Sequence, residues 1–183
     1  MYYRLSRRHN YIYYSAVGLS VLLIGLLQGV PVFPRLFGVY PLPLIALTVC
    51  VAAFNSEVTG FMTGLACGII MDITSPAPDG FNALFLMIAG LALGLLTELL
   101  FNDRFVTTAI LSFATVAAYY IIYWLIRIVP MGVQGVGYYL VRYSLPAAVY
   151  TWCFTVPFFF TARWFSRKSL SDKPIGSGRG GLK

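Results

Sequence analysis

The chain has 183 residues, of which 59% are hydrophobic and 10% are charged, whereas a soluble domain carries about 25% charged side chains. Too few polar side chains remain to cover a water-facing surface, so the composition excludes a soluble enzyme module and indicates one integral membrane domain. The net charge of +7 resides mostly at the chain ends, a membrane-orientation pattern that argues against a nucleic-acid-binding face.

Six apolar stretches approach the roughly 20 residues that a helix needs to cross a bilayer. They are predicted at Ile12–Val30, Tyr40–Phe54, Val58–Ile73, Phe81–Phe101, Phe105–Val129 and Leu140–Phe165. The second and third are short, so we expect them to tilt little or to be extended by flanking residues. The pattern predicts an all-α bundle of six transmembrane helices over residues 1–165 and a basic, disordered cytoplasmic tail over residues 166–183. Pro146 and Pro157 should kink the last span.

Both chain ends are expected in the cytoplasm, because basic residues gather on that side of a membrane. With six spans, ten of the 13 basic residues fall on the cytoplasmic side, including Arg104 in the loop before the fifth span. Arg35, Arg127 and Arg142 fall near the outer face. An even number of spans is therefore expected.

Glycines recur every fourth residue in the third span and line a similar row in the fourth. The rows contain Gly60, Gly64, Gly68 and Asp72, and then Asn82, Gly90, Gly94 and Glu98. Small residues at this spacing let two helix backbones approach closely. Between the rows lies Thr74-Ser75-Pro76-Ala77-Pro78-Asp79-Gly80, whose prolines and glycine end one helix before the next begins. The two spans therefore predict an antiparallel hairpin.

Asp72 lies near the outer end of this hairpin, and two interpretations of it stay open. An acidic group at membrane depth is costly unless it faces protein or water, so it could contact a partner, a ligand or a proton. Alternatively, it could tie the turn together through Thr74, Ser75 or the first amides of the next helix. Glu98 is interpreted as a solvated acid at the interface.

The hairpin resembles the signature of the MreD family, the rod shape-determining membrane proteins of bacteria. That signature is a run like G-x-x-x-G-L-x-x-G-x-x-x-D-x-x-S followed by a short turn and L-G-x-N-A-L. The matching positions are Gly60, Gly64, Leu65, Gly68, Asp72, Ser75, Gly80, Asn82, Ala83 and Leu84. The resemblance continues through Gly90 and Gly94 and, by span count and length, covers nearly the whole chain. Asp79 departs from it, because the family often has Leu before the turn glycine.

The resemblance implies a multi-pass scaffold of the bacterial cytoplasmic membrane that supports lateral peptidoglycan synthesis in the cell-elongation machinery. Its implied partner is MreC, and more indirectly RodA, a class B penicillin-binding protein and MreB. It implies no catalysis. The residues agree, because the only histidine is His9 and no paired carboxylates, metal-ligand cluster or nucleophile elbow occurs. No cofactor or metal is expected, and membrane lipid is an expected contact of the basic tail.

The family also looks like the substrate-binding S components of energy-coupling-factor vitamin transporters, which likewise have six spans and an outward-facing pocket. A transporter subunit is therefore the alternative function. In that case Asp72, Asn82, Arg127 and Arg142 would line an outer pocket. Tyr119, Tyr123 and Tyr138 would stack on the ligand. Otherwise the arginines extend to lipid headgroups and the tyrosines anchor the membrane interface.

Overall fold

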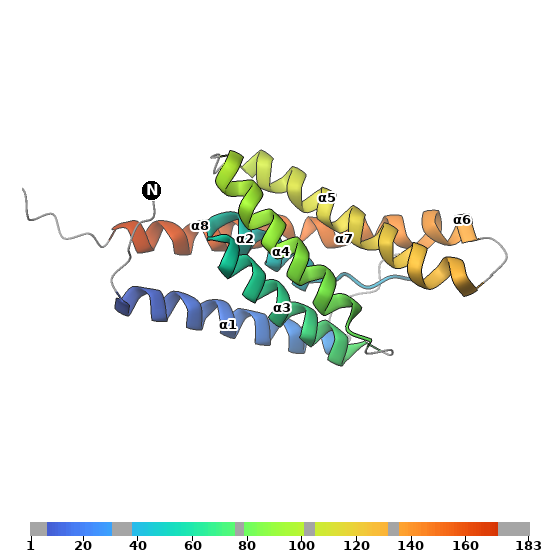
Figure 1. Cartoon of the computed structure of the whole chain (residues 1–183), viewed down its shortest axis with the longest axis horizontal. Coiled ribbons are helices and arrows are strands. Elements are labelled where there is room, and N and C mark those ends of the chain that lie inside the picture. Colours follow the sequence, from blue (N-terminus) through green and yellow to red (C-terminus); the bar gives the residue numbers. More distant parts are fainter. Residues whose placement is uncertain (1–6, 31–37, 76–78, 101–104, 132–135, 172–183) are drawn as a thin grey trace, which may run out of the picture.

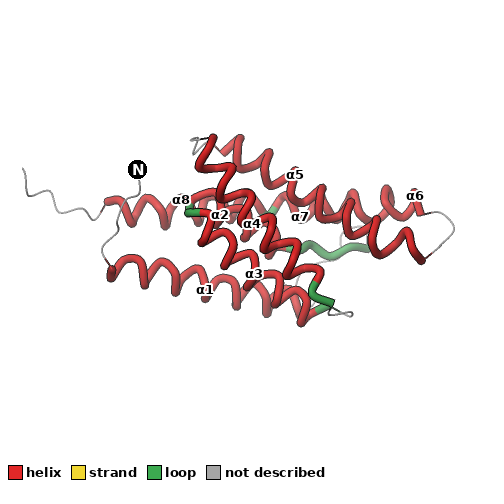
Figure 2. The backbone as a smooth tube through the Cα atoms, viewed as in Figure 1, coloured by secondary structure: helices red, strands yellow, loops and turns green. Residues whose placement is uncertain are grey.

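The computed structural model describes residues 7–30, 38–75, 79–100, 105–131 and 136–171. Over these residues the chain folds into an elongated helical bundle without β-strands (Figures 1 and 2). The α-helices are α1 (Arg7–Gly29), α2 (Pro43–Phe54), α3 (Glu57–Thr74), α4 (Phe81–Leu100), α5 (Phe105–Tyr123), α6 (Val136–Tyr139), α7 (Leu145–Cys153) and α8 (Thr155–Ser171). The residues Arg35, Arg104 and 172–183, on which part of the predicted orientation and tail depends, lie outside the described part.

Each of the six predicted spans corresponds to an apolar helical segment. Three segments are long and apolar enough to cross a membrane: Glu57–Thr74, Phe105–Ile128 and Leu140–Arg163. Three others are apolar but shorter: Tyr14–Gly29, Pro43–Phe54 and Phe81–Thr97. The all-helical class is therefore confirmed, while the six crossings and the orientation of the ends stay predictions. Helix α8 continues to Ser171, a few residues into the segment predicted as tail.

Helix α2 forms the centre of the bundle. Its ten residues from Pro43 to Ala52 are all buried, and it contacts α1, α3, α4, α5, α7 and α8. A helix that is apolar all round is expected in such a position. The helix begins at Pro43 rather than at the predicted Tyr40, because a residue that precedes proline is disfavoured in the helical conformation. Leu42 accordingly has φ −115° and ψ 72°.

Prolines disturb the last two long segments in a regular way. A π-helical turn covers Trp124–Ile128 after α5, and another covers Leu140–Ser144 before α7. A proline has no N–H to bond the carbonyl four residues earlier, and for Pro130 and Pro146 that carbonyl falls inside each π-helical turn. For Pro157 the corresponding carbonyl belongs to Cys153, the last residue of α7, and the break between α7 and α8 follows directly at Phe154. The kinks predicted at Pro146 and Pro157 thus take the form of a π-helical turn and a helix break.

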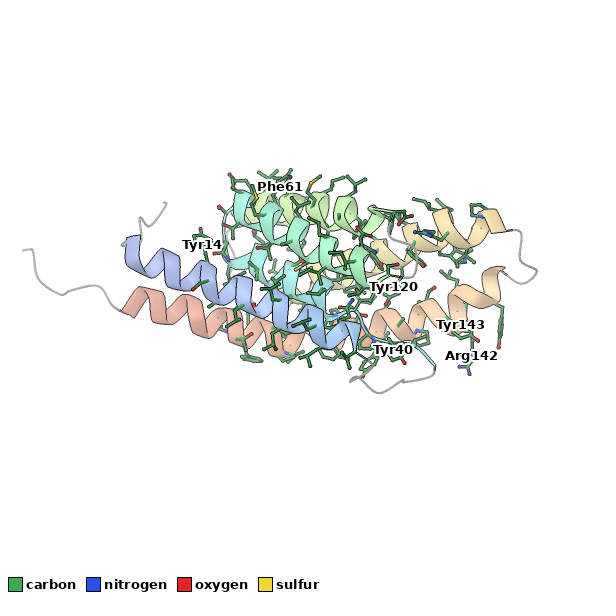
Figure 3. All side chains as sticks on the ribbon, turned by 90° about the horizontal axis from the view of Figure 1, so that it is seen from below. Tyr14, Tyr40, Phe61, Tyr120, Arg142 and Tyr143 are labelled. Carbon is green, nitrogen blue, oxygen red and sulfur yellow. The ribbon has the colours of Figure 1, made fainter. Side chains whose placement is uncertain are left out.

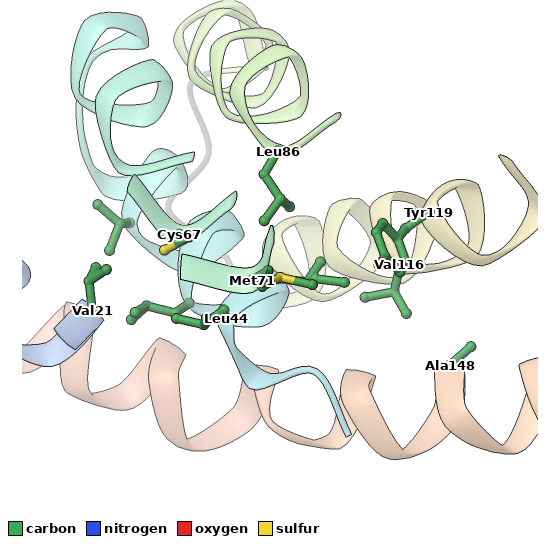
Figure 4. Packing of buried hydrophobic residues seen from close by; sticks show 11 residues of the cluster. Val21, Leu44, Cys67, Met71, Leu86, Val116, Tyr119 and Ala148 are labelled. Carbon is green, nitrogen blue, oxygen red and sulfur yellow. The ribbon is translucent and has the colours of Figure 1, made fainter. Parts of the chain in front are cut away.

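The largest cluster of buried apolar side chains joins α2 to the helices around it (Figure 4). Leu44 and Ile45 of α2 are fully buried, and Met71 of α3 and Leu86 of α4 pack in the same cluster. Tyr119 of α5 belongs to it with 4% of its surface exposed. The apolar core therefore extends to one end of the α3–α4 hairpin, where the polar residues of the predicted motif lie.

Candidate functional site

Backbone-to-backbone packing holds α3 and α4 together, and this pair makes the most extensive helix contact of the described chain. A Cβ added at Gly64 would overlap the backbone carbonyl group of Leu86, and one added at Gly90 would overlap the carbonyl of Gly60. At Gly68 the added atom would lie 2.6 Å from the carbonyl oxygen of Asn82. Gly94 packs in the same way against the backbone of Glu57. Only glycine fits at these positions without displacing the opposite helix.

Asp72 connects the end of α3 to the start of α4. Its Oδ1 accepts the backbone N–H of Asn82 at 3.2 Å and the side-chain amide of Asn82 at 2.9 Å. Its Oδ2 accepts the backbone N–H of Ala83 at 2.8 Å. These amides belong to the first turn of α4 and have no partner within the helix. Gly80 makes the preceding turn with φ +76°, a conformation that favours glycine. Of the two interpretations of Asp72, this geometry agrees with the local tie.

Asn82 extends this connection to a third helix. The hydroxyl of Tyr119 on α5 donates to Oδ1 of Asn82 at 2.7 Å, and both residues are buried. Tyr119 is also packed edge-on against Phe85 and stacked on Tyr123, with ring centroids 5.3 Å and 6.0 Å apart. A continuous hydrogen-bonded series therefore runs from Asp72 through Asn82 to Tyr119. These hydrogen bonds hold α3, α4 and α5 in one arrangement at the end of the bundle where Gly80 makes its turn.

A cavity of about 610 Å³ opens next to this series. We call it the tyrosine cavity, after the side chains of Tyr40, Tyr119, Tyr120, Tyr123 and Tyr143 in its wall. Figure 3 shows Tyr40, Tyr120 and Tyr143 gathered at one end of the bundle, with Tyr14 at the other. The described part of the lining also contains the amide side chains of Gln28 and Asn82 and contains no charged residue. The cavity suits an uncharged group that offers hydrogen bonds and a flat or apolar surface.

Only part of the predicted pocket is found in this wall. Asn82, Tyr119 and Tyr123 line the cavity as predicted. Arg127 instead forms an ion pair with Asp79 and lies over the ring of Tyr123, 5.9 Å from its centroid.

The remaining residues predicted for the pocket lie elsewhere. Asp72 is buried with 7% exposure by its bonds to α4. Arg142 is exposed and points away from the bundle (Figure 3). Tyr138 is 69% exposed. The predicted arginine-lined pocket is thus corrected to an uncharged one, because the carboxylate of Asp79, distant in sequence, binds Arg127 and the second π-helical turn carries Arg142 outward.

Several lining residues had no sequence motif to mark them. Tyr120 contacts the Thr151 hydroxyl at 3.3 Å, and that hydroxyl also accepts the backbone N–H of Leu42 at 3.1 Å. The Gln28 side chain accepts the N–H of Leu44 at 3.4 Å, at the start of α2. Gln28 alone carried a usable signal, since an amide within an apolar span usually contacts protein.

A comparison with known protein families shows to which family the chain is related. The family model described as rod shape-determining protein MreD matches residues 9–169. The chain belongs to the MreD family. No curated protein and no solved structure matches the chain. Membership in the MreD family indicates a role in rod shape determination and, with the apolar helices, a membrane protein. The description of the family names shape determination and no catalytic activity.

Proposed function

We propose that this protein is a non-catalytic scaffold of the bacterial cell-elongation machinery, which binds MreC and supports lateral peptidoglycan synthesis. The observation that carries the proposal is the family match over residues 9–169. The construction of the matched motif supports it, because the glycines and Asp72 fix the α3–α4 hairpin through backbone contacts. Such a hairpin offers a fixed platform on which a scaffold can hold its partners. RodA, a class B penicillin-binding protein and MreB are the indirect partners.

The proposed topology has six spans in the cytoplasmic membrane, with both ends in the cytoplasm. The start of α1 and the end of α8 lie at the same end of the bundle (Figure 1), which supports an even number of crossings. In this orientation the Gly80 turn and the tyrosine cavity face outward. The short α2, about 18 Å long, would not cross the roughly 30 Å hydrocarbon layer by itself. The extended segment before Pro43 and the surrounding helices would complete that crossing, since non-helical backbone is tolerated inside protein.

We place MreC against the membrane-embedded part and the tyrosine cavity. Tyrosine is enriched at protein interfaces, where its ring supplies apolar contact and its hydroxyl a hydrogen bond. An extracytoplasmic segment of MreC next to its single span could use both features without a countercharge. Co-expression in detergent followed by size exclusion tests the contact, and the two proteins should elute together at micromolar concentration. Separate elution would contradict the proposal.

A variant that fills the cavity makes this test sharper. Ala147 lines the cavity and is 5% exposed, so Ala147→Phe should reduce the available volume and the recovery of MreC. Ala162→Phe in α8, which lies outside the cavity lining, serves as the control. Both variants must first give the same monodisperse elution in the absence of MreC. Equal MreC recovery with both would show that the cavity takes no part.

The vitamin-transporter subunit stays the second candidate, and the tyrosine cavity is the observation that favours it. Its volume of about 610 Å³ lies in the range of small-molecule sites. A panel of vitamins added to the purified chain should raise its melting temperature if one of them binds, since a ligand of the folded state stabilises it. The scaffold proposal predicts no such increase, and a shift that Ala147→Phe abolishes would favour the transporter.

A further inference from the structure

A groove runs between α1 and α3, and its lining shares no residue with that of the tyrosine cavity. We call it the α1–α3 groove. It has a volume of about 560 Å³, and its walls include Tyr14, Gly18 and Leu22 of α1 and Thr59, Thr63 and Ala66 of α3. The wall is mainly apolar. The groove is therefore a separate feature from the candidate site.

The two helices run in the same direction and spread apart toward their first residues. Near their last residues they are in contact, since a Cβ added at Gly25 would overlap the side chain of Ile70, and one added at Gly29 would lie 3.2 Å from Thr74. At Gly18, by contrast, an added Cβ meets no atom within 4 Å. Near the opposite end the hydroxyls of Tyr14 and Thr59 approach to 3.5 Å. The groove is thus narrow at one end and bordered by hydroxyl groups at the other.

The dimensions indicate what the groove can hold. Its α3 wall extends from Val58 to Ile70, about 18 Å at the helical rise of 1.5 Å per residue. The groove is open along one side and has a volume of about 560 Å³. It is long and wide enough to seat one extended hydrocarbon chain.

Charge and polarity distinguish the two ends. Helix α1 begins with Arg7 and Arg8, which precede Tyr14 by about two turns. Basic residues at this level attract anionic headgroups, and the hydroxyls of Tyr14 and Thr59 can bond ester or phosphate oxygens. Beyond them the wall becomes apolar toward Ile70. A basic end, a hydroxyl border and an apolar channel follow the order of headgroup, ester and acyl chain in a phospholipid.

We propose that the α1–α3 groove holds one acyl chain of an anionic phospholipid whose headgroup lies at the Arg7 end of α1. Surrounding lipid is as apolar as the groove, so burial of apolar surface does not by itself favour binding. Occupancy depends on how well the acyl chain fits the groove, because that fit supplies contacts that an empty groove would lack. It also depends on the charge of the lipid headgroup. The lipid would join α1 to α3 where the helices themselves are apart. This proposal does not depend on the scaffold function or on MreC.

Native mass spectrometry of the purified full chain tests the proposal with two lipids of identical acyl chains, phosphatidylglycerol and phosphatidylcholine. The wild-type protein should retain one phosphatidylglycerol and prefer it by about thirtyfold, as expected from two basic residues near the headgroup. Gly18→Leu places a side chain in the open groove and should lose the retained lipid. Gly137→Leu is the matched control, because an added Cβ there also meets no atom within 4 Å, and α6 lies at the other end of the bundle from the start of α1 (Figure 1).

A further variant separates the contribution of the acyl chain from that of the headgroup. Replacing Arg7 and Arg8 together by glutamine should leave one lipid bound and abolish the preference for phosphatidylglycerol. The proposal is overturned if the wild-type protein retains no lipid, or retains both lipids equally. It is also overturned if Gly18→Leu retains as much lipid as Gly137→Leu. Displacement of a co-purifying protein by Gly18→Leu, with lipid retention unchanged, would assign the groove to a protein partner instead.

Discussion

Asp72 and Asn82 are joined twice, because the backbone N–H and the side-chain amide of Asn82 both donate to the same Oδ1 atom of Asp72. The pair ties the end of α3 to the first turn of α4. Tyr119 donates to the other side of the Asn82 amide and brings α5 into the same connection. A buried acid in the membrane domain thus has a structural role that depends on its full set of acceptors.

Asp72→Asn should destabilise the protein even though it preserves the side-chain shape. The carboxylate accepts three N–H groups, and asparagine would direct an NH₂ group toward at least one of them. A buried donor left without an acceptor costs about 1–3 kcal/mol. Thermal unfolding in detergent measures the change. Asp79→Asn is the control, because its exposed ion pair with Arg127 should contribute at most about 1 kcal/mol, and equal effects of the two changes would contradict this role of Asp72.

The role of Asp72 could be only partly predicted from the sequence. The Asp-to-Asn spacing and the intervening prolines indicated a turn with free helix-start amides, so the tie was one of two interpretations. The choice between them depends on the angle at which α4 leaves the turn. That angle is set by the close approach at Gly64 and Gly68, a tertiary contact that local spacing does not specify.

Gly64→Ala should reduce the yield of folded protein and lower its melting temperature. The added methyl group would overlap the carbonyl group of Leu86, which is backbone and cannot rotate away. Overpacking of this kind costs about 1–3 kcal/mol. Gly137→Ala, which meets open space, should leave both quantities unchanged. If both variants purified and melted like the wild-type protein, the close packing of α3 on α4 would be wrong at this position.

Tyr119→Phe should cost about 1–3 kcal/mol, because it keeps the packed ring but leaves the buried Oδ1 of Asn82 without the hydroxyl that donates to it. Tyr123→Phe is the paired control, since Tyr123 is 37% exposed and water can replace a bond of its hydroxyl. Chemical denaturation in a fixed detergent gives both values. A larger loss of stability for Tyr123→Phe would indicate that the buried series of hydrogen bonds does not end at Tyr119.

The cavity was harder to predict than the hairpin. Asn82, Tyr119 and Tyr123 were expected in it because they lie near one predicted membrane face. Arg127 was expected there too, but its ion pair with Asp79 spans 48 residues of sequence and has no local pattern. The wall also contains Tyr40 and Tyr143, from segments that meet only after α2 has entered the centre of the bundle. Hydrophobic stretches predict the helices, whereas the order in which they pack decides the cavity.

Cysteine labelling should establish six spans with both ends in the cytoplasm. The background variant carries Cys153→Ser, because Cys153 is exposed whereas Cys50 and Cys67 are buried. An impermeant thiol reagent applied to intact cells should label Ala77→Cys in the α3–α4 turn and should not label Ser171→Cys at the end of α8. Labelling of Ser171→Cys should appear only after the cells are opened. The reverse pattern would overturn the orientation.

The most direct test of the scaffold proposal is the width of rod-shaped host cells during depletion of this protein, measured by imaging. Without the scaffold, the synthesis enzymes lose their productive arrangement, so the cells should widen and round up while nutrient uptake stays normal. Re-expression of the wild-type chain should restore the width, and re-expression of Gly64→Leu should not. Cells that keep their width and grow slowly until a vitamin is supplied would contradict the scaffold and favour the transporter subunit.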